Sequence, residues 1–541
     1  MATLGGLAAA TGGAGPTGLD LIDPIYNAIV GAAVVFAGGR SRRYAWLATT
    51  IATVWLAPDL PLRVIAIAAV GAALYALATE RRRWLGAAAA LAVVVVLARL
   101  GTGPVHGSTT LLAALAVTPI VVSALRRLPE GRLRAIGAVV TSAVGAATVA
   151  TLVFGIAALL SLGDVNTAVD EATDGLSLAS DGDQEGAAAA LERAEAAFTD
   201  ARDLVGGVWS APARLVPIVG QHARAVQVAT SEGVSLTATA REAATTVDVD
   251  EIRLTDGALD LDLLDRLAPV LSRAEDAIRR ARDRLTAVED PWLAAPIADR
   301  LDDLTTELDD ALPAAETAAV AVRELPALLG RGDTARWLVL STTPAEARGL
   351  VGLVGNYLVV EARDGRIEIA GVGRNEDLNL LLADAGATIE APPQYVERWG
   401  PSGVERLFQD VTLEPDLPSV AQVAADLYQQ ATGLSIDGVA VADPFAFEAV
   451  LELTGPVDAG GTRLGSANVV DFLLVDQYAA FETENQRVLA LGELITNTFS
   501  AFTAGGLPGP RGLAATIGPV VEEGRLGIWW RDGGTAAELI E

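Results

Sequence analysis

The chain of 541 residues contains no cysteine, no lysine, one methionine and two histidines. Without cysteine it forms no disulfide, has no thiol nucleophile and binds no metal through sulfur. His106 and His222 both precede residue 336, so the C-terminal part holds neither a Ser-His-Asp triad nor a histidine metal site. All remaining basic side chains are arginines, which can grip phosphate or carboxylate through two parallel hydrogen bonds.

The net charge of −29 is unevenly distributed. Residues 1–162 contain twelve arginines against five acidic residues, a net +7, so the rest of the chain carries −36. Because phosphate binding needs a basic face, this acidity excludes nucleic acid as a partner. The mean hydropathy of +0.39 is high for a chain with 20% charged residues. The two values are compatible because the apolar residues are gathered in the N-terminal part.

Six apolar runs within the first 162 residues predict a bundle of transmembrane helices. A bilayer core needs about 20 apolar residues, and the second and fourth runs are short. Two runs could form one re-entrant hairpin, so we predict about six spans, with four as the lower bound. The near absence of ionisable residues inside them favours an anchor over a transporter. The runs are Leu21–Gly39, Tyr44–Pro58, Leu62–Thr79, Trp84–Ala98, Thr110–Leu125 and Ala135–Leu162.

Arginine placement predicts how the spans are oriented. Arginines cluster after the first, third and fifth runs, whereas the alternate loops hold only Arg63, Arg99 and His106. The positive-inside rule places the clusters in the cytoplasm and both chain ends outside. This predicts a multi-pass protein of the cell membrane with an extracytoplasmic C-terminal part. The clusters are Arg40, Arg42 and Arg43; Arg81, Arg82 and Arg83; and Arg126, Arg127, Arg132 and Arg134.

Changes of composition and period divide the chain into four predicted parts. Residues 1–20 form an extracytoplasmic tail, and residues 21–162 form the membrane helices. Residues 163–335 form an acidic helical stalk or bundle, because apolar residues recur there at helical spacing. Residues 336–541 form an α/β or α+β domain, because strand and helix patterns are mixed. The helical patterns of the third part cover 185–205, 219–246, 260–288 and 298–329.

Short local signals place the elements of the C-terminal domain. Asp364-Gly365 predicts a hairpin turn, and Asp443 followed by Pro444 predicts a capped helix start. The predicted strands are Trp337–Ser341, Asn356–Glu361, Arg366–Ala370, Gly438–Val441 and Arg525–Trp530. The predicted helices are Ser419–Ala431, Pro444–Leu453, Ser466–Tyr478, Thr483–Ala504 and Arg511–Val521. The glycines Gly349, Gly352 and Gly355 do not open a helix, so they predict a tight turn or close backbone packing instead of a dinucleotide site.

Five stretches resemble the bacterial domain-of-unknown-function 4012 family in their order and spacing. They are TTPAEARG...VGNY, VTLEPDLPSVAQVAADLY, IDGVAVADPFAFEAVLELTGPV, SANVVDFLL..QY..F and LPGPRGLAATIGPVVEEGRLGIWW. The resemblance covers about Ala335–Trp530, and that family has no established activity to transfer. The family is distantly similar to the LytR–CpsA–Psr envelope enzymes. Those enzymes attach glycopolymers carried on a lipid pyrophosphate to the cell wall, using arginines and a divalent metal.

The distant similarity implies a site built on arginines. Arg348, Arg374 and Arg487 are the candidate pyrophosphate-binding residues, since they follow the first strand, follow the hairpin and open a late helix. Glu376 and Asp377 are the candidates for a metal ligand or a base, and the implied cofactor is a divalent metal such as Mg²⁺. No catalytic residue is assigned, because Gly-Leu-Val-Gly follows Arg348 where the enzymes have an aspartate.

Two functions from different classes stay open. In the first, a membrane-anchored envelope protein binds an envelope polymer or a partner protein through its extracytoplasmic domain. In the second, a transferase moves a glycopolymer from a polyprenyl-pyrophosphate carrier to a cell-wall acceptor. The missing aspartate favours binding. Convergence of the three arginines in one pocket would favour the transferase.

Overall fold

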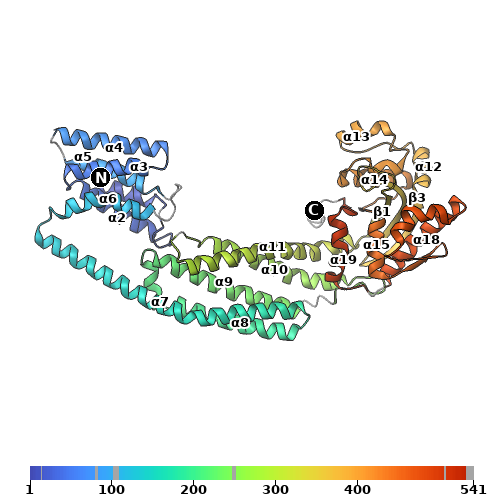
Figure 1. The fold of residues 1–541 in the computed structure, drawn as a ribbon, viewed down its shortest axis with the longest axis horizontal. Helices are drawn as coiled ribbons and strands as arrows, with labels where there is room; N and C mark the ends of the chain where they lie inside the picture. Colours follow the sequence, from blue (N-terminus) through green and yellow to red (C-terminus); the bar gives the residue numbers. More distant parts are fainter. Residues whose placement is uncertain are drawn as a thin grey trace. The chain divides into compact units, whose positions relative to one another are not determined.

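The computed structural model describes residues 1–13, 15–79, 83–100, 109–246, 251–290, 292–504 and 507–531. They form two compact units, residues 1–241 with 277–311 and residues 242–276 with 312–541. The first unit is built of helices, and the second combines helices with a mixed β-sheet (Figure 1). Arg81, Arg82 and His106, on which part of the predicted orientation depends, lie outside the described residues.

Helices occupy all six positions at which apolar runs predicted spans. Within the described ranges, however, only two of them are long and apolar enough to cross a membrane. The prediction of six spans is therefore wrong in number. The other four have 14 to 17 residues, and at about 1.5 Å per residue they fall short of a hydrocarbon core of roughly 30 Å. The two long helices are α4 (Leu60–Thr79) and α7 (Glu130–Ser180), and the short ones are α2 (Asp23–Gly38), α3 (Arg43–Leu56), α5 (Arg83–Leu97) and α6 (Thr109–Leu125).

Small residues let these helices approach closely. A Cβ on Gly38 would lie 2.8 Å from the carbonyl oxygen of Gly86, and a Cβ on Gly86 would enter the ring of Trp46. The indole N–H of Trp46 is within hydrogen-bond distance of the Gly38 carbonyl, at 2.7 Å, and of Ser41 Oγ, at 2.6 Å. Contacts of this kind allow helices to pack backbone against backbone. A further helix, α1 (Ala2–Ala10), lies within the segment predicted as a tail.

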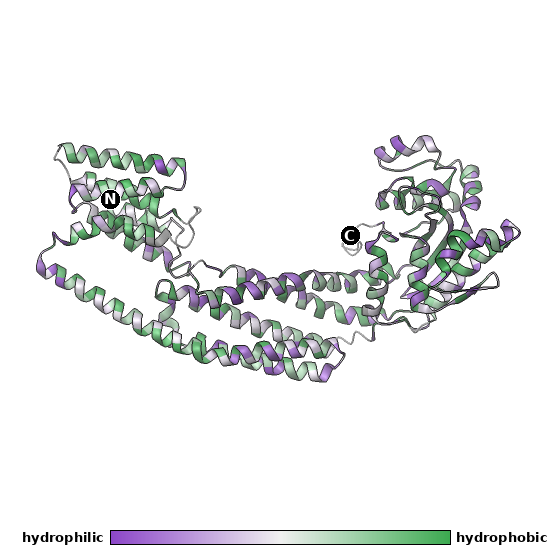
Figure 2. Ribbon diagram, in the orientation of Figure 1, coloured by the Kyte–Doolittle hydropathy of each residue, from purple (hydrophilic) through white to green (hydrophobic). Residues whose placement is uncertain are grey.

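The 51-residue helix α7 changes character along its length. Residues 131–146 are all exposed, although most are apolar, and Figure 2 shows mainly green and white along this part. After residue 162 the helix becomes acidic and packs against α8 (Gln184–Gly206). Gly182, with φ at +85°, turns the chain between them, and Asp183 caps α8 by accepting the Gly186 N–H at 2.9 Å.

The remaining helical elements before the sheet agree with the predicted segments. The 3₁₀ turn at Ala211–Leu215 coincides with the break that Pro212 introduces. The acidic side chains of these helices are mostly exposed, as expected for solvated helix faces. The helices are α9 (Val219–Thr246), α10 (Leu261–Thr286) and α11 (Ala295–Leu328).

The sheet of the second unit has the strand order β3-β2-β1-β4-β7. Strand β1 pairs antiparallel with β2 and parallel with β4, and β7 runs antiparallel to β4. The predicted turn at Asp364-Gly365 joins β2 to β3 with both φ angles positive, +46° and +84°. The strands are β1 (Ala335–Thr343), β2 (Leu353–Arg363), β3 (Arg366–Arg374), β4 (Gly438–Ala442) and β7 (Leu526–Trp530).

Helices cover both faces of this sheet, which makes the domain an α/β sandwich. Side chains of β1 alternate between the faces, as a pleated strand requires. Leu338 and Leu340 pack with α12 (Asn375–Ala385) and α14 (Leu417–Thr432) on one face. Trp337 and Val339 pack on the other face, with α15 (Pro444–Thr454) and α18 (Glu484–Thr503). The other elements are α13 (Pro393–Trp399), the 3₁₀ helices Gly400–Ser402 and Phe408–Leu413, β5 (Val457–Ala459), β6 (Thr462–Leu464), α16 (Val469–Asp471), a π-helix (Phe472–Asp476), α17 (Gln477–Ala480) and α19 (Pro510–Glu522).

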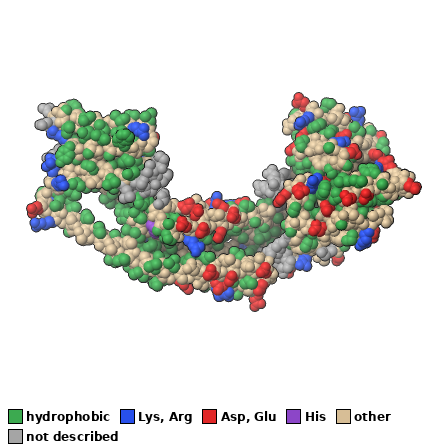
Figure 3. Space-filling model, viewed as in Figure 1, with side chains coloured by type: hydrophobic (Ala, Val, Ile, Leu, Met, Phe, Trp, Pro, Cys, Tyr) green, Lys and Arg blue, Asp and Glu red, His purple; other side chains and the backbone are tan. Residues whose placement is uncertain are grey.

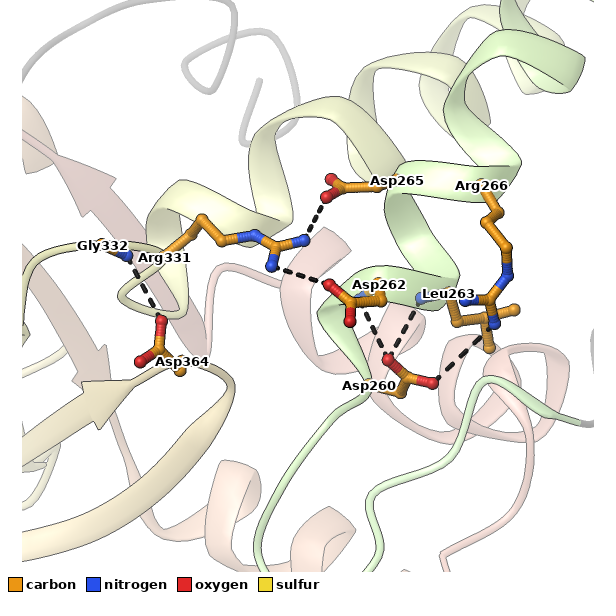
Figure 4. A network of polar contacts seen from close by, with 8 residues as sticks. All are labelled: Asp260, Asp262, Leu263, Asp265, Arg266, Arg331, Gly332 and Asp364. Atoms are coloured by element: carbon orange, nitrogen blue, oxygen red, sulfur yellow. Dashed lines mark hydrogen bonds and ion pairs between the residues drawn. The ribbon is translucent and has the colours of Figure 1, made fainter.

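The start of α10 and the end of α11 belong to the sheet-containing unit, so this unit begins before residue 336. Arg331, just after α11, donates to Asp262 Oδ1 at 2.9 Å and to Asp265 on α10 (Figure 4). Asp364, in the hairpin turn, accepts the N–H of Gly332 at 3.4 Å. These contacts tie both helix ends to the β2–β3 hairpin.

Several predicted elements differ from the structure. Strand β2 begins three residues earlier, and β3 ends four residues later, than predicted. Helix α14 begins two residues before the predicted start, because Asp416 is its cap and accepts the Ser419 N–H at 3.0 Å. The predicted helix Ser466–Tyr478 is divided into α16, a π-helix and α17. The short β5–β6 hairpin was not predicted, because strands of three residues are too brief to show a period of two.

Candidate functional site

A cavity of about 320 Å³ opens in the α/β domain at the carboxyl ends of the parallel strands β1 and β4. In the sheet, β1 is followed by β2 on one side and β4 is followed by β7 on the other side, so the chain leaves the two parallel strands in opposite directions. Crevices in α/β sheets form where that happens. Strand β1 contributes Ser341, Thr342 and Thr343 to the lining, and α15 contributes Pro444 and Phe447.

One wall of the cavity is a face of α18. Thr483 and Gln486 start this helix as a capping box, each side chain accepting the backbone N–H of the other residue at 3.3 and 3.2 Å. The lining residues of α18 recur at intervals of three and four, which places them on one side of the helix. The side chains of this wall are charged in the first turn of α18, and they are apolar and buried in the third. These residues are Glu484, Arg487, Val488, Leu491, Leu494 and Ile495.

Two of the three candidate arginines meet in this cavity. Arg374 ends β3 and Arg487 lies in the first turn of α18, and their side chains are only 26% and 27% exposed. Glu484 lies between them, with Oε1 3.7 Å from Arg374 Nη2 and 3.4 Å from Arg487 Nη2. Arg374 Nη2 also donates to Glu376 at 2.6 Å. The guanidinium of Arg487 lies 4.9 Å from the ring centre of Tyr478, a cation–π distance.

Arg348 does not line the cavity. Its Nε donates to Asp410 Oδ1 at 2.7 Å, and both side chains are largely buried, with exposed fractions of 20% and 18%. Its Nη1 donates to the carbonyl of Ala347 at 2.9 Å. Arg348 therefore fixes the loop after β1 against the 3₁₀ helix Phe408–Leu413.

The glycines that follow Arg348 serve backbone packing, as predicted. A Cβ on Gly349 would lie 2.3 Å from the carbonyl oxygen of Leu413, and one on Gly352, with φ at +110°, would lie 2.1 Å from that of Thr343. Both distances exclude a side chain. Gly355 differs, because it lines the cavity and its Cβ would meet only Ser341 O at 3.9 Å. The absence of a side chain at Gly355 thus leaves space for a ligand.

The two candidate carboxylates lie in different environments. Asp377 is not part of the lining, and its Oδ2 accepts the backbone N–H of Arg374 at 3.3 Å, which holds the start of α12. Glu376 lines the cavity together with Glu346 and Glu484. In the described part of the chain no three acidic or histidine side chains lie close enough to share a metal ion. Glu376 and Glu484 already face guanidinium groups, so this arrangement does not fit the oxygen cage that Mg²⁺ requires, and the divalent metal stays a prediction.

Several lining residues carried no signal in the sequence. One of them is Thr343, whose Oγ1 is buried and finds no hydrogen-bond partner among the described residues. Leu473, Gln477 and Tyr478 face the cavity from the π-helix and the turn after it. The wider π turn spaces side chains differently from an α-helix, which hides this face from a 3.6-residue pattern. Single-turn π segments are frequent at functional sites.

Tyr357, the neighbour of the lining residue Asn356, does not point into the cavity. Tyr357 follows Asn356 on β2 and points to the opposite face, where its ring lies 5.7 Å from that of Tyr428. Burial raises the pKa of Tyr357 to about 12, with smaller contributions from Tyr428 and Asp377. Its hydroxyl therefore stays protonated at neutral pH. Gly373, opposite on β3, leaves room for the ring, because a Cβ there would lie 2.3 Å from the hydroxyl oxygen.

Residues 333–478 match the family described as "Protein of unknown function (DUF4012)". This segment belongs to that family. The DUF4012 segment begins just before β1 and includes Arg374, whereas Arg487 and the rest of the α18 wall lie beyond it. No curated protein and no solved structure matches the chain. The comparisons do not show the distant similarity to the LytR–CpsA–Psr enzymes, which stays a prediction.

Proposed function

We propose that this chain is a membrane-anchored protein whose α/β domain binds an anionic ligand in the cavity beside α18. The supporting observation is the position of Glu484, whose carboxylate lies within 3.7 Å of both Arg374 and Arg487. Two guanidinium groups that approach one carboxylate can approach a phosphate or pyrophosphate in the same way. The absence of a side chain at Gly355 adds room for the ligand.

The anchor is supported by the apolar part of α7. Residues such as Val139, Leu152 and Leu159 are 61–69% exposed on a helix that is apolar on all sides. Apolar surface of this kind is unfavourable in water and favourable in a bilayer. The apolar run Ala135–Leu162 is about 42 Å long as a helix, enough to cross a bilayer core of roughly 30 Å. Four arginines at positions 126–134 precede the apolar run of α7, and the next arginine after it is Arg193. The positive-inside rule for this one span places the α/β domain outside the cell membrane, where an envelope polymer is the natural ligand class.

Transfer of a glycopolymer from a polyprenyl-pyrophosphate carrier is the second candidate function. It is favoured by Arg374 and Arg487 sharing one cavity, whose wall becomes apolar along α18. A transferase would also need a base, and Glu376 is the candidate that lines the cavity. Glu376 is 62% exposed and paired with Arg374, which suits a binding contact better than proton abstraction.

The experiment is a titration of the full-length protein in detergent with polyprenyl pyrophosphate and with inorganic pyrophosphate, with and without Mg²⁺. Saturable binding in which inorganic pyrophosphate competes supports the anion site. Release of a glycan from its lipid carrier on addition of cell-wall acceptor would favour the transferase. Absence of any saturable binding would overturn the proposed site.

Glu484 should compete with the ligand for the two arginines. We expect Glu484→Gln to bind pyrophosphate about two- to fivefold more tightly, because a partly exposed ion pair is worth up to about 1 kcal/mol. Isothermal titration calorimetry measures the change. Glu482→Gln is the matched control, since this exposed neighbour removes the same charge but does not line the cavity. An equal gain of affinity in both variants would show that the affinity for pyrophosphate depends only on the net charge of the domain.

A further inference from the structure

Seven arginines lie at the ends of consecutive N-terminal helices, in two segments that are distant in the sequence. The segments span residues 38–44 and 123–134, and Glu130 is the single acidic residue in them, so their net charge is +6. One segment follows α2 and starts α3, and the other ends α6 and starts α7. The arginines, here named the arginine face, are Arg40, Arg42, Arg43, Arg126, Arg127, Arg132 and Arg134.

Hydrogen bonds hold the two segments of the arginine face together. Arg127 Nη1 donates to the carbonyl of Arg40 at 3.3 Å, and the backbone N–H of Arg42 donates to Ser123 Oγ at 2.7 Å. Ser123 is buried, and so are Ser41 and Trp46, which fix the turn after α2 from inside. The two segments therefore form one continuous surface, the arginine face, and are not independent loops.

The side chains of this surface are accessible and are accompanied by aromatic residues. All seven arginines except the half-buried Arg43 are exposed. Figure 3 shows blue side chains gathered at one end of the N-terminal helices. Arg40 lies 3.7 Å from the ring centre of Phe36, and Arg42 Nη1 donates to the Tyr44 hydroxyl at 3.2 Å. Both rings are more than half exposed, as is typical of aromatic residues at the headgroup level of a bilayer.

We propose that the arginine face binds the headgroups of anionic phospholipids in the cytoplasmic leaflet. This inference rests on the anchoring by α7 proposed above, which leaves both segments of the arginine face on the cytoplasmic side of the membrane. Guanidinium groups bind phosphate through paired hydrogen bonds, and basic side chains next to a membrane are attracted to a negatively charged leaflet. The alternate helix ends carry no comparable cluster among the described residues. There Arg63 and Arg99 donate to carbonyl oxygens of their own segments, at 3.1 and 2.8 Å.

The test compares lipid binding by the full-length protein and two variants in detergent. Phosphatidylglycerol and phosphatidylcholine of equal chain length are titrated and retention is measured by native mass spectrometry. We expect the wild-type protein to prefer phosphatidylglycerol, and Arg126→Gln/Arg132→Gln to bind it about tenfold more weakly, with phosphatidylcholine unchanged. This variant leaves the Arg127–Arg40 contact in place. Arg63→Gln/Arg99→Gln is the matched control and should behave as the wild type.

Three results would overturn the inference. They are equal binding of the two lipids, an equal loss in the control variant, and displacement of phosphatidylglycerol by an acidic peptide, which would indicate a protein partner. Alkaline carbonate extraction of cell membranes separates this failure from that of the anchor. Retention in the membrane without a lipid preference would contradict only the proposed binding of phospholipids by the arginine face. A protein that carbonate releases contradicts the anchoring as well.

Discussion

Reversing the charge of both cavity arginines, in an Arg374→Glu/Arg487→Glu variant, is expected to lower the affinity for pyrophosphate about 1000-fold or more. Each hydrogen bond to a charged group contributes about 1.5–3 kcal/mol, and loss of two such contacts corresponds to about three powers of ten in affinity. The new carboxylates would add repulsion beside Glu376 and Glu484. Titration calorimetry of the full-length protein measures the effect, and circular dichroism checks the fold.

The matched control for this prediction is Arg406→Glu/Arg463→Glu. It makes the same change in net charge within the same domain, at side chains that are 71% and 63% exposed and lie outside the cavity lining. We expect its affinity to stay within about twofold of the wild type, because exposed charges are screened by salt. Retained binding in the Arg374/Arg487 variant would contradict the site. An equal loss of affinity in the control would show that the overall electrostatic field of the domain determines binding.

Replacement of Asp443 by alanine is expected to lower the free energy of unfolding of the α/β domain by about 2–3 kcal/mol. Asp443 is fully buried at the start of α15. Its Oδ1 accepts the N–H groups of Phe445 and Ala446 at 2.8 and 3.2 Å, and its Oδ2 faces Arg525 Nη1 at 3.2 Å. The substitution removes the helix cap and also the hydrogen bond with Arg525, whose side chain is 34% exposed and keeps Glu523 at 3.7 Å.

Two further variants separate these contributions. Asp416→Ala removes an exposed cap of the same kind, from α14, and should cost only about 1 kcal/mol. Asp443→Asn keeps the capping oxygen and removes the charge, so it should fall between the two alanine variants. Urea unfolding followed by tryptophan fluorescence measures all three, since Trp529 and Trp530 lie on β7. Equal losses in Asp443→Ala and Asp416→Ala would contradict the role of burial and of Arg525.

Local signals in the sequence were sufficient to place most elements of the α/β domain. Asp364-Gly365 and Asp443-Pro444 lie where the structure has a hairpin turn and a capped helix start. Each signal depends on residues within a few positions of one another, so it acts through backbone geometry before any tertiary contact forms. The glycines Gly349 and Gly352 were likewise assigned correctly to backbone packing.

In the N-terminal helical part, local signals in the sequence predicted the positions of the helices but not their lengths. Hydropathy located six helices, but it did not give their lengths, because turns shorten α2, α3, α5 and α6 below the thickness of a bilayer. The arginines were visible in the sequence as three clusters, yet only the fold shows that two of them form one surface. The bonds Arg127–Arg40 and Arg42–Ser123 join segments that no spacing rule connects.

The sequence by itself determined the class of the domain, the position of its strands and the arginines and carboxylates from which a site could be made. Only the tertiary structure decided which of them share a cavity. Arg374 and Arg487 meet because β3 and α18 are neighbours in space, whereas Arg348 turns to Asp410 and supports a loop. The π-helix at Phe472–Asp476 and the buried hydroxyl of Thr343 were also invisible in the sequence. The physical reason is that helices and turns are set by near neighbours along the chain, while a binding site is set by packing between elements that are far apart in it.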